Sequence, residues 1–173
     1  MTKADMRHGR LGWLVLFLIN VIVALIWASF MQAGLLDFLV GMAIGTLVLT
    51  IFEPSYGRLI VRLISFAIYV AFAILVSNFR LAWTVIQPRQ RMQERIDPGI
   101  VAIPLTIESE LGIIVLASVI TLTPGTLTVD LGQNAAGERV LFVHNLMVGD
   151  PDAFRVEIQE TFEKRILQII AEA

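Results

Sequence analysis

The sequence predicts a membrane protein: an α-helical transmembrane hairpin, a third amphipathic helix, and a small α/β domain in the order β-α-β-β-α. Hydrophobic residues make up 57% of its 173 residues, charged residues only 16%, and the mean hydropathy is +0.78. Between Leu11 and Gly57 only Asp37 and Glu53 are charged, which leaves room for helices of about 20 apolar residues that cross a bilayer. Beyond residue 96 the chain becomes acidic and alternates short strand and helix patterns.

Three segments are therefore expected: a membrane hairpin over residues 1–57, a third helix with a linker over 58–96, and an α/β domain over 97–173. The first span, Gly12 to Met31, has about the length needed to cross a bilayer. Asn20 is its one strongly polar side chain. In lipid such a side chain needs a hydrogen-bond partner, so Asn20 is predicted to contact a neighbouring helix.

The second helix is predicted from Phe38 to Phe52, after a connection short enough to give an antiparallel pair. Gly41 and Gly45 stand four residues apart in this helix. This spacing removes side chains from one face and allows another helix to approach closely. The two glycines are predicted either to form such a packing face or to be residues that the helix merely tolerates.

The third apolar stretch, Arg58 to Gln87, carries a polar stripe. Most of its polar residues recur three or four positions apart: Arg58, Arg62, Ser65, Tyr69, Ser77, Arg80, Thr84 and Gln87. A helix of this kind either lies in the membrane interface or spans the membrane with its stripe turned toward protein. The interfacial or steeply tilted placement is favoured, with a full third span as the alternative.

Charge distribution favours this placement and predicts the orientation. Basic residues collect in cytoplasmic segments next to membrane helices. With the amino terminus in the cytoplasm, a two-helix hairpin returns Arg58 and Arg62 to that side, and an interfacial helix keeps Arg89, Arg91 and Arg95 there too. We therefore expect a multi-pass membrane protein whose carboxyl-terminal domain is cytoplasmic.

The carboxyl-terminal domain is predicted to be a small mixed sheet covered by two helices. Turn residues and apolar patterns give a strand, a helix and a two-stranded hairpin over Ile100–Leu105, Glu108–Leu122, Thr126–Leu131 and Arg139–Met147. A last helix begins with Asp150 as its N-cap and Pro151 at its first position. Its apolar stripe consists of Phe154, Ile158, Phe162, Ile166, Ile169 and Ile170.

Few residues suggest catalysis or the binding of a metal or cofactor. The chain has no cysteine and two histidines, His8 and His144, and contains no Gly-rich phosphate loop or paired-histidine metal motif. His144 is interpreted as structural, with a ligand or proton-carrier role as the alternative. The acidic domain argues against nucleic-acid binding. The sequence predicts no enzyme activity, no cofactor, no metal site and no small-molecule substrate.

One set of motifs resembles a known family. The string ITLTPGTLTVD at residues 120–130, PGIVAIPL at 98–105, FVH at 142–144 and FEKRIL at 162–167 are similar to the E subunit of multisubunit Na+/H+ antiporters of the Mrp or Mnh type. The resemblance covers nearly the whole chain. Ser118 stands where the family pattern leads us to expect Asn, which puts in doubt any role for an amide there.

The resemblance implies an accessory, non-catalytic subunit that supports assembly and stability of a cation/proton antiporter, with the other subunits and membrane lipid as partners. An independent membrane-anchored sensor or ligand-binding module is the alternative. A structural role in turning the chain is favoured for the Thr-Pro-Gly-Thr motif, and partner contact is its alternative. The residues predicted to serve in partner packing or as structural motifs are Asn20, Gly41, Gly45, Arg58, Arg62, Thr121, Thr123, Pro124, Gly125 and Thr126.

Overall fold

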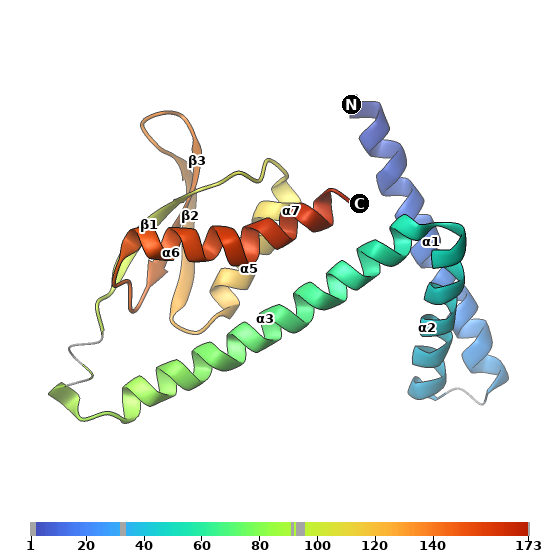
Figure 1. Cartoon of the computed structure of the whole chain (residues 1–173), viewed down its shortest axis with the longest axis horizontal. Coiled ribbons are helices and arrows are strands. Elements are labelled where there is room, and N and C mark those ends of the chain that lie inside the picture. Colours follow the sequence, from blue (N-terminus) through green and yellow to red (C-terminus); the bar gives the residue numbers. More distant parts are fainter. Residues whose placement is uncertain (1–2, 32–33, 91, 93–95, 173) are drawn as a thin grey trace. The chain divides into compact units, whose positions relative to one another are not determined.

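The computed structural model describes residues 3–31, 34–90, 92 and 96–172. The chain divides into two compact units, one formed by Met1–Ile64 with Ile169–Ala173 and the other by Ser65–Gln168. Figure 1 traces the elements in order from blue to red. These units group residues by their contacts, and the predicted segment boundaries at residues 57 and 96 stay predictions. Arg91 and Arg95, on which part of the predicted orientation rests, lie outside the described residues, as do the side chains of residues 1–11.

Three long apolar helices come first, as the sequence predicted. They are α1 (Lys3–Phe30), α2 (Leu35–Phe52) and α3 (Pro54–Ile86). Each contains a stretch long and apolar enough to cross a membrane, with Gly12–Phe30 forming the stretch in α1. The start of α2 lies three residues before the predicted position, because the Gly34 N–H donates to the Asp37 carboxylate at 3.2 Å and caps the first turn.

The α/β part has the predicted element order but a different sheet. It contains β1 (Gly99–Pro104), α5 (Glu110–Leu122), β2 (Thr126–Gln133) and β3 (Arg139–Asn145). The three strands lie in the order β1-β3-β2, with both pairs antiparallel, so the expectation of a mixed sheet was wrong. The short β2–β3 connection makes these two strands antiparallel neighbours, and β3 then pairs with β1 along its other edge.

The closing helical segment begins as predicted. Asp150 is the N-cap of α6 (Pro151–Ile158), and its carboxylate accepts the Asp152 N–H at 2.9 Å. A π-helical turn, η1 (Gln159–Glu163), then joins α6 to α7 (Lys164–Ile170), and Figure 1 shows the three as one continuous rod. The π turn was not predicted, because the apolar spacing of the sequence fits an ordinary helix.

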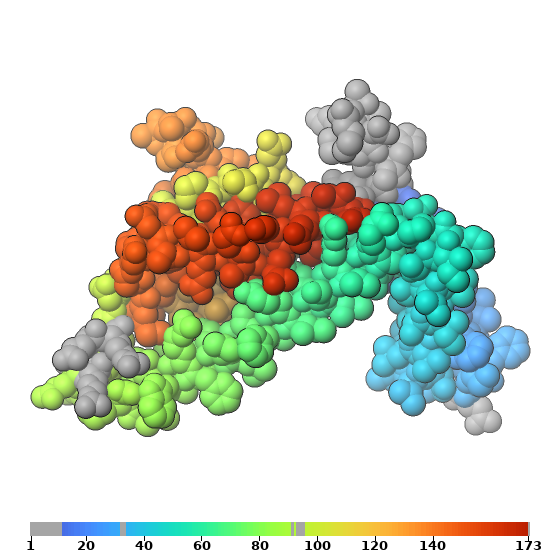
Figure 2. All heavy atoms as spheres, in the orientation of Figure 1, coloured from blue at the N-terminus to red at the C-terminus, as the bar shows by residue number. Residues whose placement is uncertain are grey.

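A single apolar core holds the second unit together. Its buried residues come from the inner face of the sheet, from the loop after β1, from α5 and from the closing helix: Val101, Ile103, Ile107, Ile113, Leu116, Val119, Ile120, Leu141, Val143, Phe154, Ile158, Phe162 and Ile166. The middle of α3 packs on this core through Phe66, Tyr69, Val70 and Ala73. Figure 2 shows the red closing helix against the green middle of α3, where Arg165 lies 4.1 Å from the centre of the Tyr69 ring.

Candidate functional site

The two glycines of α2 lie at a close helix contact. Gly41 and Gly45 are both buried. A Cβ atom on Gly41 would lie 3.0 Å from the Cα atom of Ala24 in α1, and one on Gly45 would lie 1.9 Å from the Asn20 side-chain oxygen. The absence of side chains at both positions therefore lets α1 and α2 approach each other at this point.

Asn20 forms the polar centre of the same contact. Its side chain is fully buried, and its amide nitrogen donates to the Thr46 hydroxyl at 2.8 Å and the Tyr56 hydroxyl at 3.2 Å. The Met42 carbonyl lies 3.4 Å away. The Asn20 oxygen has no partner among the residues that the structure describes. The amide thus links α1 to α2 and to the start of α3.

Arg58 and Arg62 form ion pairs within the first unit. The Arg58 Nε lies 3.2 Å from one oxygen of Glu172, and an Arg62 guanidinium nitrogen lies 3.0 Å from the other. The Glu172 side chain is only 15% exposed, whereas the arginine side chains are more open. The two arginines therefore hold the carboxyl-terminal end of the chain against the start of α3.

The threonines of the Thr-Pro-Gly-Thr motif hydrogen-bond to backbone groups. The Thr123 hydroxyl donates to the Val119 carbonyl at 2.9 Å, and the Thr126 hydroxyl lies 2.6 Å from the Ile120 carbonyl. The Thr121 hydroxyl accepts the Thr128 N–H at 3.2 Å. These bonds pair carbonyls at the end of α5 and an N–H on the outer edge of β2.

Gly125 and Pro124 make the turn itself. Gly125 has a φ of +93°, a conformation that side chains disfavour, and a Cβ atom there would meet nothing within 4 Å. The Pro124 carbonyl accepts the Ser77 hydroxyl of α3 at 2.7 Å. The turn is thus fixed by its own backbone conformation and by the third helix.

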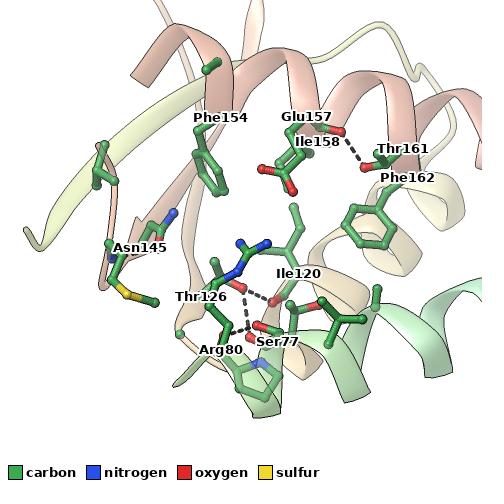
Figure 3. A pocket seen from close by; sticks show the side chains of 18 of the residues that line it. Ser77, Arg80, Ile120, Thr126, Asn145, Phe154, Glu157, Ile158, Thr161 and Phe162 are labelled. Carbon is green, nitrogen blue, oxygen red and sulfur yellow. Dashed lines mark hydrogen bonds between the residues drawn. The ribbon is translucent and has the colours of Figure 1, made fainter. Parts of the chain in front are cut away.

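A pocket of about 400 Å³ lies beside this turn, within the second unit. Its lining comes from α3, from the end of α5 and the Thr123–Thr126 turn, from the end of β3 and the segment that follows it, and from α6 and η1. Figure 3 shows the Arg80 side chain entering the pocket from α3 and the Glu157 carboxylate pointing into it from α6. The structure therefore brings residues 123–126 together around one cavity, whereas Arg58, Arg62 and the glycine contact belong to the first unit.

Arg80 and Glu163 were not singled out as site residues from the sequence. Glu163 is 1% exposed, and one of its oxygens accepts the Thr106 N–H at 2.6 Å, the Thr106 hydroxyl at 2.9 Å and the Ile107 N–H at 3.0 Å. Its other oxygen has no partner among the described residues. Only its place on the buried stripe, between Phe162 and Ile166, distinguishes Glu163 from its solvated neighbours.

His144 lies in β3, opposite Ile100 and Leu127 on the neighbouring strands. Among the residues that the structure describes, no three His, Asp or Glu side chains gather in a way that could hold a metal ion. The described residues thus form close helix contacts, a turn held by hydrogen bonds and a pocket lined by charged side chains.

Comparison with known proteins identifies relatives over most of the chain. A sequence model of the family MNHE, described as Na+/H+ ion antiporter subunit, matches residues 20–169. The chain is similar to the E subunit of the Na+/H+ antiporter of Alkalihalophilus pseudofirmus, with 28% identity across 88% of this chain and 96% of that protein.

Two solved structures are also similar. One is the Mrp complex from a Dietzia species, whose matching chain is 29% identical with a TM-score of 0.46, covering 62% of this chain and 94% of that one. The other is the membrane-bound sulfane sulfur reductase, an archaeal respiratory membrane complex, whose matching chain is 24% identical with a TM-score of 0.50. The match covers 89% of this chain and 98% of that one, and the likeness concerns the fold.

Proposed function

Because the chain belongs to the MNHE family of Na+/H+ ion antiporter subunits, we propose that it is an accessory, non-catalytic subunit of a multisubunit cation/proton antiporter in a bacterial plasma membrane. In this role it supports assembly and stability of the complex, while partner subunits carry the ions. The family match confirms the resemblance carried by the ITLTPGTLTVD motif. The role within the complex is our proposal.

The polar content of the candidate spans is the observation that carries this proposal. Carriers of protons and cations normally place ionisable groups within the membrane, facing a pathway. In the three candidate spans the one carboxylate is Asp37, in the first turn of α2, and the arginines are Arg58, Arg62 and Arg80 of α3. Asn20 uses its amide to join helices, and Gly41 and Gly45 provide close packing. These residues are suited to assembly rather than to ion transfer.

We further propose that the middle and second half of α3 lie in the membrane interface. From Phe66 to Ala73 this helix packs on the core of the α/β domain, and the Ser77 hydroxyl bonds to the Pro124 carbonyl of that domain. The domain carries many charged side chains. A perpendicular α3 would draw these charges into the hydrocarbon, which costs several kcal/mol for an ion by order of magnitude.

The exposed apolar side of α3 supports the same placement. It exposes a row of large apolar side chains: Ile68, Phe72, Leu75, Phe79, Trp83 and Ile86. In an interfacial helix this row reaches the acyl chains while the domain stays in water. With the basic residues on the cytoplasmic side, the domain is cytoplasmic. A protease-protection assay in which the domain is shielded inside right-side-out vesicles agrees with this orientation, and external cleavage contradicts it.

For the Thr-Pro-Gly-Thr motif we propose a structural role. Its hydroxyls serve backbone groups of α5 and β2, and Gly125 supplies the positive φ of the turn. The motif then ends the helix and directs the chain into the sheet.

Two assays test the accessory role. The isolated chain in proteoliposomes should show no cation/proton exchange, and deletion of its gene should lower the amount of assembled complex and the exchange activity of the host membranes. Exchange by the isolated chain alone would contradict a non-catalytic role. Unchanged assembly after deletion would contradict a role in assembly.

A further inference from the structure

We propose that the pocket beside Arg80 binds the phosphoethanolamine headgroup of a membrane phospholipid. The Arg80 guanidinium would receive the phosphate, and the carboxylates of Glu157 and Asp150 would receive the ammonium. The proposal deepens the proposed function, because it rests on the interfacial placement of α3. It assigns a ligand to a cavity of about 400 Å³, a volume in the range of small-molecule sites, which is about 300–1,000 Å³.

The positive side of the pocket has unused donors. The Arg80 guanidinium makes no hydrogen bond or ion pair with any residue that the structure describes, and Figure 3 shows it pointing into the cavity. Asn145, which is only 9% exposed, also lines the pocket. Its side-chain oxygen accepts the Met147 N–H at 3.0 Å, which leaves its amide nitrogen without a partner among those residues. A guanidinium and an amide N–H suit phosphate oxygens.

The negatively charged side of the pocket also has carboxylate oxygens that are available to a ligand. The Glu157 carboxylate points into the pocket from α6 and has no partner among the described residues (Figure 3). Asp150 also lines the pocket, and one of its oxygens accepts the Asp152 N–H at the start of α6. An ammonium group with three N–H donors can bond to both carboxylates. The two charge signs share one cavity without forming an ion pair.

This arrangement selects a zwitterion. A simple phosphate would meet the guanidinium but also two carboxylates, and a simple amine would meet the guanidinium. An ethanolamine phosphate places each charge next to its opposite. A choline headgroup keeps the charges but has no N–H to donate, and a glycerol headgroup has no positive charge, so both should bind less well.

The rim of the pocket indicates a lipid rather than a soluble molecule. Phe72 and Val76 of α3 line the cavity and are also 63% and 40% exposed. Farther along the helix, Phe79 is 75% and Trp83 is 63% exposed. Acyl chains leaving the pocket beside Phe72 and Val76 would therefore meet exposed apolar side chains of α3.

The experiment is native mass spectrometry of the full chain, delipidated in detergent and mixed with equal amounts of phosphatidylethanolamine, phosphatidylcholine and phosphatidylglycerol. We expect one lipid per chain, with phosphatidylethanolamine preferred. Glycerophosphoethanolamine, which has the headgroup without acyl chains, should compete poorly. Equal retention of the three lipids would overturn the proposal, and strong competition by the soluble headgroup would overturn its assignment to a lipid.

Variants assign the contacts. Arg80→Gln should weaken retention of phosphatidylethanolamine about tenfold, the effect of losing one charge-assisted contact. Arg89→Gln, which changes an exposed arginine outside the pocket lining, is the control and should change nothing. Glu157→Gln should lower the preference over phosphatidylglycerol, because Asp150 alone then receives the ammonium, whereas Glu160→Gln, on an exposed residue paired with Lys164, should preserve it. If Arg80→Gln and Arg89→Gln weakened retention equally, or if Glu157→Gln and Glu160→Gln changed the lipid preference equally, the assignment would be refuted.

The readout separates this inference from the proposed function. Lipid retention is measured on the chain alone, so it does not depend on partner subunits. A chain that assembles with antiporter subunits but shows no Arg80-dependent lipid preference would overturn the inference and leave the proposed function intact. If the chain joins no complex but retains the lipid through Arg80, the proposed function is overturned and the inference stands.

Discussion

Two glycines illustrate how the same residue serves different physical needs. Gly45 is required because a neighbouring helix lies too close for a side chain, since a Cβ atom there would lie 1.9 Å from the Asn20 oxygen. Gly125 has open space around it but a φ of +93°. The first glycine therefore acts through packing and the second through backbone conformation, and substitutions should separate the two effects.

Gly45→Ala should destabilise the membrane hairpin by about 1–3 kcal/mol, the usual effect of overpacking. Asn20 cannot move aside freely, because its amide is held by Thr46 and Tyr56. Gly12→Ala is the matched control: a Cβ atom at Gly12 meets nothing within 4 Å, and alanine favours helix. Thermal unfolding of both variants in detergent measures the difference. Equal stability of the two would contradict the close contact.

Gly125→Ala should lower stability by about 1–2 kcal/mol, because alanine disfavours a positive φ. Gly137, in the turn between β2 and β3, has a φ of +81° and the same open surroundings, so Gly137→Ala should be equally destabilising. If the motif is structural, both variants should keep whatever association with partner subunits the folded chain shows. Selective loss of association in Gly125→Ala, measured by co-purification, would instead indicate a partner contact.

At the scale of elements, the buried carboxylate of η1 joins the closing helix to the loop after β1. Glu163→Ala should cost about 2–4 kcal/mol, because the N–H groups of Thr106 and Ile107 lose their acceptor. Glu163→Gln keeps one acceptor oxygen and should cost less. Glu160→Ala, on the exposed surface, should change stability by less than about 0.5 kcal/mol. Denaturant unfolding that ranks the three variants in another order would refute this account of Glu163.

The placement of α3 predicts a depth profile. Spin labels at Ile68, Leu75, Phe79 and Ile86, all on the exposed apolar face, should report similar and shallow positions in the bilayer if the helix lies in the interface. In a spanning helix the depth would change by about 1.5 Å per residue along the axis. Paramagnetic accessibility measurements in nanodiscs distinguish the two, and labels that pass through the bilayer centre would rule out the interfacial placement.

The elements that could be predicted are those whose signals are local. Asp150, followed by Pro151, gave the start of the closing helix, and Pro124-Gly125 gave the end of α5. The order of the strands has no such local signal. It depends on the pairing of β1 with β3, a strand that lies beyond α5 and β2 in the sequence. The π turn at Gln159–Glu163 was not predicted, because the apolar spacing of this segment fits an ordinary helix.

At the scale of the whole molecule, the division into an apolar membrane part and an acidic α/β part follows from composition, but the pocket does not. Arg80, Thr126, Asn145 and Glu157 line one cavity although they come from four separate parts of the chain. In the sequence Arg80 is one member of a polar stripe and Glu157 one carboxylate of a solvated face. The pairing of β2 with β3 places Thr126 opposite Asn145, and the packing of α3 and α6 on the domain core adds Arg80 and Glu157.

The central claim is membership in a multisubunit antiporter, and one measurement tests it most directly. The tagged full chain is purified from its own host in mild detergent, and everything that elutes with it is identified by mass spectrometry. We predict stoichiometric co-elution of several very hydrophobic antiporter-like subunits. A folded chain that elutes alone would contradict the claim and favour an independent membrane-anchored ligand-binding module.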